Sequence, residues 1–145
     1  MRCSIKEAEK EASRWLAQAI DDLRFFQWIQ KENRFFDKGC FIAQQSGKKA
    51  LKACLYGIGR RRVIGHSLFE MVSELSKEAT EFQPVVDSCK RLDRFYIPTR
   101  YPNGLPGGTP FKVYTDQDLR GALDDLTAVL AIAQKYLKKL GISGS

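Results

Sequence analysis

Apolar and small side chains recur at spacings of three and four residues between Cys40 and Leu55. They occupy positions 40, 43, 47, 50, 51 and 54, and glutamines and lysines fill most of the positions between them. This period places the apolar residues on one face of an α-helix. The segment therefore predicts a core helix with a polar and basic flank, which carries Gln44, Gln45, Lys48, Lys49 and Lys52.

The same period recurs along the chain, and no segment shows the strict alternation of a half-buried strand. It predicts further helices over about Lys6–Lys31, from Ser67 to about Ala79, over Pro84–Ile97, and from Thr115 through the lysine-rich segment near residue 139. The second helix is expected to run from about Phe36 to Tyr56. We therefore predict an all-α fold, an antiparallel four-helix bundle with an additional short helix.

Two helix starts have the form of a capping box, in which a hydroxyl side chain precedes an acidic one by three residues. These are Ser67 to Glu70 and Thr115 to Asp118. Between the last two predicted helices, Ile97–Tyr114 contains prolines and glycines throughout and is expected to be a long irregular loop, a kind of segment that is usually functional or disordered. The length predicts a single domain over residues 1–140, followed by a flexible tail over 141–145.

The chain carries 24 Lys and Arg against 17 Asp and Glu, a formal net charge of +7. Such a balance favours partners that carry phosphate, or an acidic protein.

The cysteines, at positions 3, 40, 54 and 89, are scattered, so we expect reduced thiols rather than disulfides, and neither a metal nor a cofactor. A charged N-terminus without a hydrophobic run predicts a cytoplasmic protein with no membrane span.

Five ordered features resemble the HEPN domains (higher eukaryote and prokaryote nucleotide-binding) over about Ala12 to Leu137. They are Ala19–Leu23 in the first helix, Cys40–Leu55 in the second, His66–Leu68 before the third, Arg100–Pro102 in the loop, and Tyr114–Thr115 before an alanine-rich last helix. One position departs from the family, because Lys48 stands where members typically have an acidic residue. This substitution makes the local surface more basic.

The resemblance implies a protein that binds nucleotide or RNA phosphates, commonly as a homodimer. It also implies a two-protein module of the toxin–antitoxin type, in which the partner is a minimal nucleotidyltransferase. The candidate ligand-binding residues are Lys48, Lys49, Lys52, Arg100 and Tyr101. Lysines four apart share a helix face, and an arginine beside an aromatic ring can hold a phosphate and stack on a base. The alternatives are a solvated lysine flank and a loop that Tyr101 anchors to the bundle.

Many relatives are metal-independent ribonucleases in which four to six residues separate an arginine from a histidine. His66 is the only histidine of the chain, and Arg60 and Arg61 precede it at this spacing. These three residues are the catalytic candidates of an alternative function, a ribonuclease toxin, in which the arginine holds phosphate and the imidazole moves a proton. In nuclease members the motif usually lies near the last helix, so the preferred interpretation makes His66 part of the N-terminal cap of the third helix and the arginines a solvated connection.

Aromatic residues crowd the first two predicted helices in too many directions to fit one buried stripe. We expect part of this surface, for instance Phe25, Trp28 and Phe35, to be exposed and to form an interface. A third possibility follows, a non-catalytic module whose helix faces bind a protein partner.

Overall fold

The computed structural model describes residues 4–144, and within this range the chain forms helices and no strand. The all-α fold is therefore confirmed. The helices are α1 (Ile5–Glu32), α2 (Phe36–Gly57), α3 (Leu68–Glu78), α4 (Val86–Asp93), α5 (Pro110–Val113) and α6 (Asp116–Lys139), with two 3₁₀ helices, η1 (Thr80–Val85) and η2 (Pro102–Gly104).

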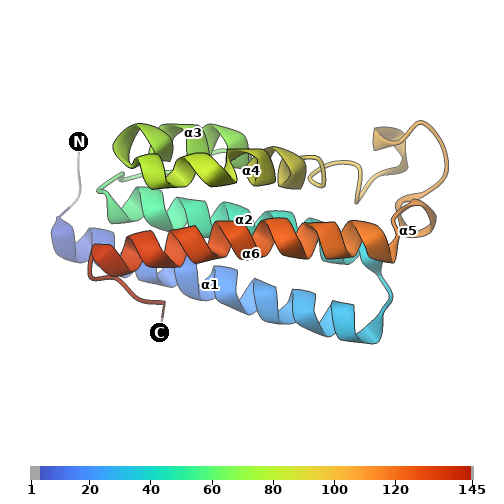
Figure 1. Ribbon diagram of the computed structural model, residues 1–145, viewed down its shortest axis with the longest axis horizontal. Coiled ribbons are helices and arrows are strands. Elements are labelled where there is room, and N and C mark those ends of the chain that lie inside the picture. Colours follow the sequence, from blue (N-terminus) through green and yellow to red (C-terminus); the bar gives the residue numbers. More distant parts are fainter. Residues whose placement is uncertain (1–3, 145) are drawn as a thin grey trace.

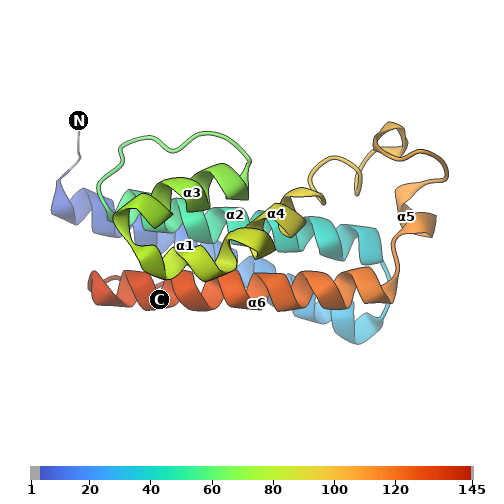
Figure 2. The same ribbon diagram turned by 45° about the horizontal axis from the view of Figure 1, so that its top comes forward.

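Helix α2 is the centre of the bundle and contacts α1, α3, α4, α5 and α6. Helices α1 and α2 are antiparallel, as are α3 and α4 (Figure 1). Helix α6 lies beside α2 and runs in the same direction, because the connection after α2 passes back along the bundle before α3 begins (Figure 2). The bundle is thus antiparallel only in part.

The core explains why α2 has small residues at several positions. A side chain at Gly47 would place its Cβ 2.8 Å from Cδ2 of Leu68 and 3.3 Å from Cδ1 of Leu92. The absence of a side chain here lets α3 and α4 pack directly on α2. The apolar side chains buried around it belong to α1, α2, α3, α4, η1 and α6 and form one continuous cluster.

The predicted start of α6 is confirmed in detail. The Thr115 hydroxyl accepts from the Asp118 N–H at 3.4 Å, and the Asp118 carboxylate accepts from the Thr115 N–H at 2.9 Å, which completes the capping box. At the start of α3, Ser67 accepts from the Glu70 N–H at 3.1 Å. The second partner there is the Asp93 carboxylate, which accepts from Leu68 N–H at 2.8 Å and from Phe69 N–H at 3.0 Å.

The helix predicted over Pro84–Ile97 differs from the structure. Pro84 lies inside the 3₁₀ helix η1, and α4 ends at Asp93, four residues before the expected end. Pro98 disfavours helical conformation at the residue before it, so the chain leaves the helix early. The expected irregular loop is interrupted by two short helices, η2 and α5.

Residues 141–144, the described part of the expected tail, lie against the bundle. Ile142 is buried and donates its N–H to the Leu137 carbonyl oxygen at 2.9 Å, and the Ser13 hydroxyl donates to the Ser143 carbonyl.

Cys40, Cys54 and Cys89 are buried and free of disulfides, and burial raises the pKa of each thiol, for Cys89 to about 12. Cys3 and Ser145 lie outside the described residues. Within residues 4–144, no helix combines the length and hydropathy that a membrane span requires.

Candidate functional site

Lys48 projects from the central helix into a largely enclosed position and is only 7% exposed. Its ammonium donates to Oε1 of Gln45 at 3.1 Å, and no carboxylate of residues 4–144 lies within ion-pair distance of it. Burial, followed by the charges of Lys52, Lys49 and Arg100, lowers the pKa of Lys48 to about 8, while Asp22 acts in the opposite direction. Lys48 is therefore a buried cation without an anionic partner.

Lys52 lies one turn further along α2 and is 8% exposed. Its ammonium lies over the ring of Trp15, 5.2 Å from the ring centre, and Trp15 in turn stacks on Tyr56 at 5.8 Å. Burial lowers the pKa of Lys52. Like Lys48, it has no carboxylate partner within the described part of the chain, so an aromatic face is the group that compensates its charge.

Lys49 differs from its neighbours because its charge is paired. Its ammonium lies 2.6 Å from a carboxylate oxygen of Asp22 on α1. Asp22 is itself buried and also accepts from Gln18 at 3.2 Å. Asp22 therefore neutralises Lys49, whereas Lys48 and Lys52 form no ion pair with a carboxylate of residues 4–144.

Arg100 comes from the irregular segment after α4 and is held by aromatic rings. Its guanidinium carbon lies 4.6 Å from the ring centres of Phe41 and Tyr96 and 5.1 Å from that of Tyr101. Its Nε donates to the Tyr96 carbonyl oxygen at 2.8 Å, and neither terminal nitrogen donates to any acceptor of residues 4–144. The side chain is thus fixed with both terminal nitrogens free, the geometry that grips an oxyanion at two points.

His66 lies in the same place, with its ring stacked on Tyr96 at 4.8 Å. Desolvation and the charges of Lys48, Lys52 and Arg100 lower the pKa of His66, which favours the neutral imidazole. Lys48, Lys52, His66 and Arg100 are called the basic cluster from here on. Three distant parts of the chain converge there: α2, the connection before α3, and the segment after α4.

Two glutamines link the members of the basic cluster. Gln44 is fully buried and donates from Nε2 to the His66 carbonyl oxygen at 3.0 Å. Gln45 donates to Oε1 of Gln44 at 2.7 Å and accepts from Lys48. This chain of hydrogen bonds fixes the connection that carries His66. The sequence pattern predicted both glutamines only as part of the polar flank, and it did not indicate that Phe41 and Tyr96 belong to the site.

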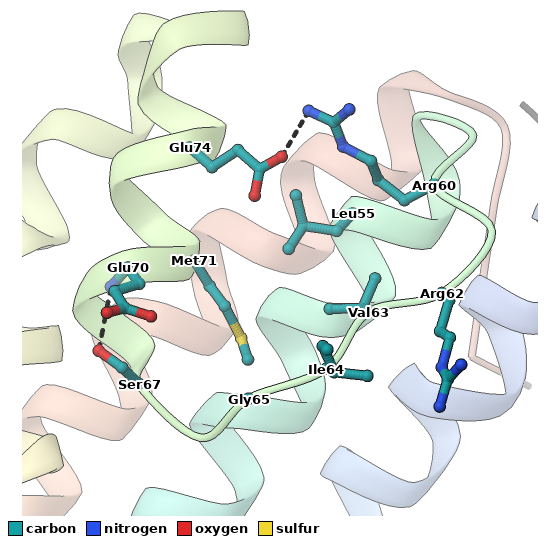
Figure 3. A pocket seen from close by; sticks show the side chains of 10 residues that line it. All are labelled: Leu55, Arg60, Arg62, Val63, Ile64, Gly65, Ser67, Glu70, Met71 and Glu74. Carbon is teal, nitrogen blue, oxygen red and sulfur yellow. Dashed lines mark hydrogen bonds and ion pairs between the residues drawn. The ribbon is translucent and has the colours of Figure 1, made fainter. Parts of the chain in front are cut away.

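Of the arginines before His66, Arg60 is paired with a carboxylate of another helix. The Arg60 guanidinium lies 2.5 Å from a carboxylate oxygen of Glu74, across a cavity of about 200 Å³ beside Met71 (Figure 3). Arg62 extends away from Glu74, and Arg61 is exposed. Arg60 therefore forms an ion pair with a carboxylate of α3. The arginine whose charge acts on His66 is Arg100.

A larger groove, of about 610 Å³, borders α1 on the side where α2 carries its lysines. It is lined by Glu11, Arg14, Trp15, Ala17, Gln18 and Lys49. Because Trp15 also lies beneath the ammonium of Lys52, the groove adjoins the basic cluster. Among residues 4–144, no group of three His, Cys, Asp or Glu side chains is placed to hold a metal ion.

The exposed aromatics predicted on the first helices are confirmed. Phe25, Trp28 and Phe35 are each about half exposed. The rings of Phe25 and Trp28 stack 6.3 Å apart on α1, and Arg34 lies 5.2 Å from the ring centre of Phe35. This aromatic face lies on the second half of α1 and the turn after it.

Comparison with known proteins agrees with the fold and its details. Residues 12–137 match the model of the HEPN domain. The crystal structure of TT1696 from Thermus thermophilus is 33% identical, with a TM-score of 0.81, and the match covers 88% of this chain and 98% of that one. ST0689, described as an archaeal HEPN homologue, is 25% identical with a TM-score of 0.65, and the match covers 90% and 98% of the two chains. No curated protein matches significantly. This chain belongs to the HEPN domain family.

Proposed function

We propose that this protein binds the phosphate groups of a nucleotide or of RNA at the basic cluster. One observation carries the proposal: Lys48 and Lys52 are more than nine-tenths buried and have no carboxylate partner within residues 4–144. Cations held close together in a largely enclosed place repel one another and lose part of their hydration, and an anionic ligand would offset that cost. Lys49 differs from these two lysines, because the Asp22 carboxylate already neutralises its charge.

The surroundings of Arg100 favour a ligand with a base over inorganic phosphate. Tyr101 is 49% exposed, and its ring lies next to the guanidinium. An exposed aromatic ring beside a fixed cation combines a stacking surface with a phosphate contact. Tyr101 therefore offers a surface on which a base of an RNA chain would rest, next to the phosphate contact of Arg100.

Membership of the HEPN family supports the remaining parts of the proposal. The protein is proposed to act in the cytoplasm as one half of a two-protein module of the toxin–antitoxin type, with a minimal nucleotidyltransferase as its partner. The excess of positive charge suits both an RNA ligand and a negatively charged partner surface.

The test is binding of a labelled single-stranded RNA oligonucleotide and of a labelled nucleotide at low salt, where contacts to phosphate are strongest. Lys48→Gln/Lys52→Gln should weaken binding by about tenfold or more, and the salt dependence should become shallower, since each lost contact reduces the slope by ~0.7 for a single strand. Lys135→Gln/Lys138→Gln, which removes the same charge from exposed positions of α6, is the matched control. Absence of binding by the wild type at low salt would refute the proposal.

The ribonuclease alternative is favoured by one observation, the position of His66, whose ring stacks on Tyr96 beside Arg100 and whose pKa is lowered by desolvation and by the charges of Lys48, Lys52 and Arg100. A neutral imidazole can accept a proton from a ribose hydroxyl while a cation holds the phosphate. Incubation with end-labelled RNA in EDTA tests it, with His66→Ala, Arg60→Ala/Arg61→Ala and Arg100→Ala in parallel. Loss of cleavage in His66→Ala and Arg100→Ala alone would assign the phosphate contact to Arg100. Loss in the double variant instead would assign it to Arg60 or Arg61, and cleavage by all four proteins would indicate a contaminant.

A further inference from the structure

The groove on α1 differs from the basic cluster in its charge. Every charged side chain that lines it is paired: Arg14 lies 2.8 Å from Glu11, and Lys49 lies 2.6 Å from Asp22. The remaining lining consists of Trp15, Ala17 and Gln18, which are aromatic, small and neutral. The groove therefore suits an uncharged, partly polar group, whereas the adjoining cluster suits an anion.

The size and position of the groove fit a nucleoside-sized group. Its volume of about 610 Å³ lies within the range of ~300–1,000 Å³ that small-molecule sites occupy. Lys52, whose ammonium lies over Trp15, is one helical turn, or about 6 Å, from Lys48, so the groove wall meets one end of the cluster. Both regions are therefore within reach of one small ligand.

We infer that the groove is the base subsite for a nucleotide whose phosphate is held by the basic cluster. The base lies beside Trp15, and the sugar passes along Lys49 and Lys52 toward Lys48 and Arg100. This inference rests on the proposed function and goes further, because it selects a nucleotide with one neutral and one anionic end and places each end. It also gives Lys52 a specific part: when the ammonium turns to the phosphate, the indole face that it covered becomes available to the base.

The experiment compares AMP with ribose 5-phosphate, which carries the same phosphate and sugar but no base. By calorimetry at low salt, AMP should bind the wild type about tenfold more tightly than ribose 5-phosphate, since stacking on an aromatic side chain contributes about that much per base. Trp15→Leu should abolish the difference in affinity between the two ligands.

Because Trp15 also packs on Tyr56, a second variant avoids the core. Ala17 is an exposed residue of α1 that lines the groove, so Ala17→Phe should obstruct the base and weaken AMP about tenfold without affecting ribose 5-phosphate. Ala131→Phe, the same change at an exposed alanine of α6, is the matched control and should bind both ligands as the wild type does.

Fluorescence gives a direct readout of contact. Trp15 and Trp28 are the only tryptophans, so Trp28→Phe leaves Trp15 as the single reporter. AMP should change the emission of this variant, with excitation where adenine does not absorb, and ribose 5-phosphate should change it less. Equal affinity for the two ligands, or an AMP preference that survives both Trp15→Leu and Ala17→Phe, would overturn the base subsite and leave phosphate binding intact. Binding of neither ligand would also overturn the base subsite, and it would refute the proposed function itself if the RNA oligonucleotide failed to bind as well.

Discussion

The protonation of Lys48 depends strongly on its surroundings. An ordinary lysine, with a pKa of 10.5, stays charged to high pH, but burial and three neighbouring cations lower the pKa of Lys48 to about 8. An anion that enters the cluster reverses part of this effect, because it favours the charged ammonium. Binding of phosphate and protonation of Lys48 are therefore linked.

This linkage predicts a pH dependence with a defined sign. Lys48 is charged below about pH 8 and loses its proton as the pH rises through that value, so the affinity for AMP should fall between pH 7.5 and about 9.5. The phosphate of AMP, with a second pKa near 6, keeps its charge over this range. Lys48→Arg, whose guanidinium stays protonated, should show a much flatter profile. A wild-type affinity that does not change over this range would contradict the prediction.

At the scale of single elements, the close packing of α3 and α4 on α2 depends on a glycine of α2. Alanine is favoured over glycine in a helix by about 1 kcal/mol. At Gly47 this gain is opposed by contact with Leu68 and Leu92, at 2.8 and 3.3 Å from the new Cβ. Overpacking of this kind costs about 1–3 kcal/mol, so Gly47→Ala should lower the free energy of unfolding.

Gly121 on α6 is the matched control, because a Cβ there meets no atom within 4 Å. Gly121→Ala should raise the free energy of unfolding by about 0.5–1 kcal/mol, as measured by urea denaturation. If Gly47→Ala and Gly121→Ala both raise the free energy of unfolding, then α3 and α4 move to accommodate the new side chain at position 47. The close packing at Gly47 would then not contribute to stability.

The start of α3 depends on a residue from the end of α4. Asp93 accepts from two N–H groups of the first turn of α3 and from the Ser67 hydroxyl at 3.2 Å. Asp93→Ala should lower the free energy of unfolding by about 1–2 kcal/mol, since it removes the partner of several donors at a helix N-terminus. Asp87→Ala, at an exposed position of the same helix, should cost less than about 0.5 kcal/mol. Equal losses would show that Asp93 contributes no more than a surface carboxylate.

These elements also show what the sequence can predict. Periodicity located the long helices, and the start of α6 was predictable because Thr115 and Asp118 cap each other within one turn. The cap of α3 by Asp93 was not, because it joins positions that only the tertiary fold brings together. The candidate site was likewise predictable only in part. Lys48 and Lys52 were visible as a helix flank, but the stacking of Arg100 on Phe41 and the link from Gln44 to His66 depend on distant segments.

At the scale of the whole molecule, the exposed aromatic face is separate from the basic cluster. Phe25 and Trp28 lie on the second half of α1, whereas the groove involves residues 11–18 of the same helix. A face that exposes stacked aromatic rings is typical of an interface. One helix can therefore serve assembly at one end and ligand binding at the other.

We predict that the protein is a homodimer through this aromatic face. Light scattering should give a mass of about twice the 16.5 kDa of one chain. Phe25→Glu/Trp28→Glu should give a monomer, since four carboxylates would face one another across a symmetric contact and lose water there. Phe111→Glu, at a more exposed ring on α5, is the control and should stay dimeric. If the double variant becomes monomeric and keeps its AMP affinity, each chain holds a complete site. If it stays dimeric, the copies meet through another surface.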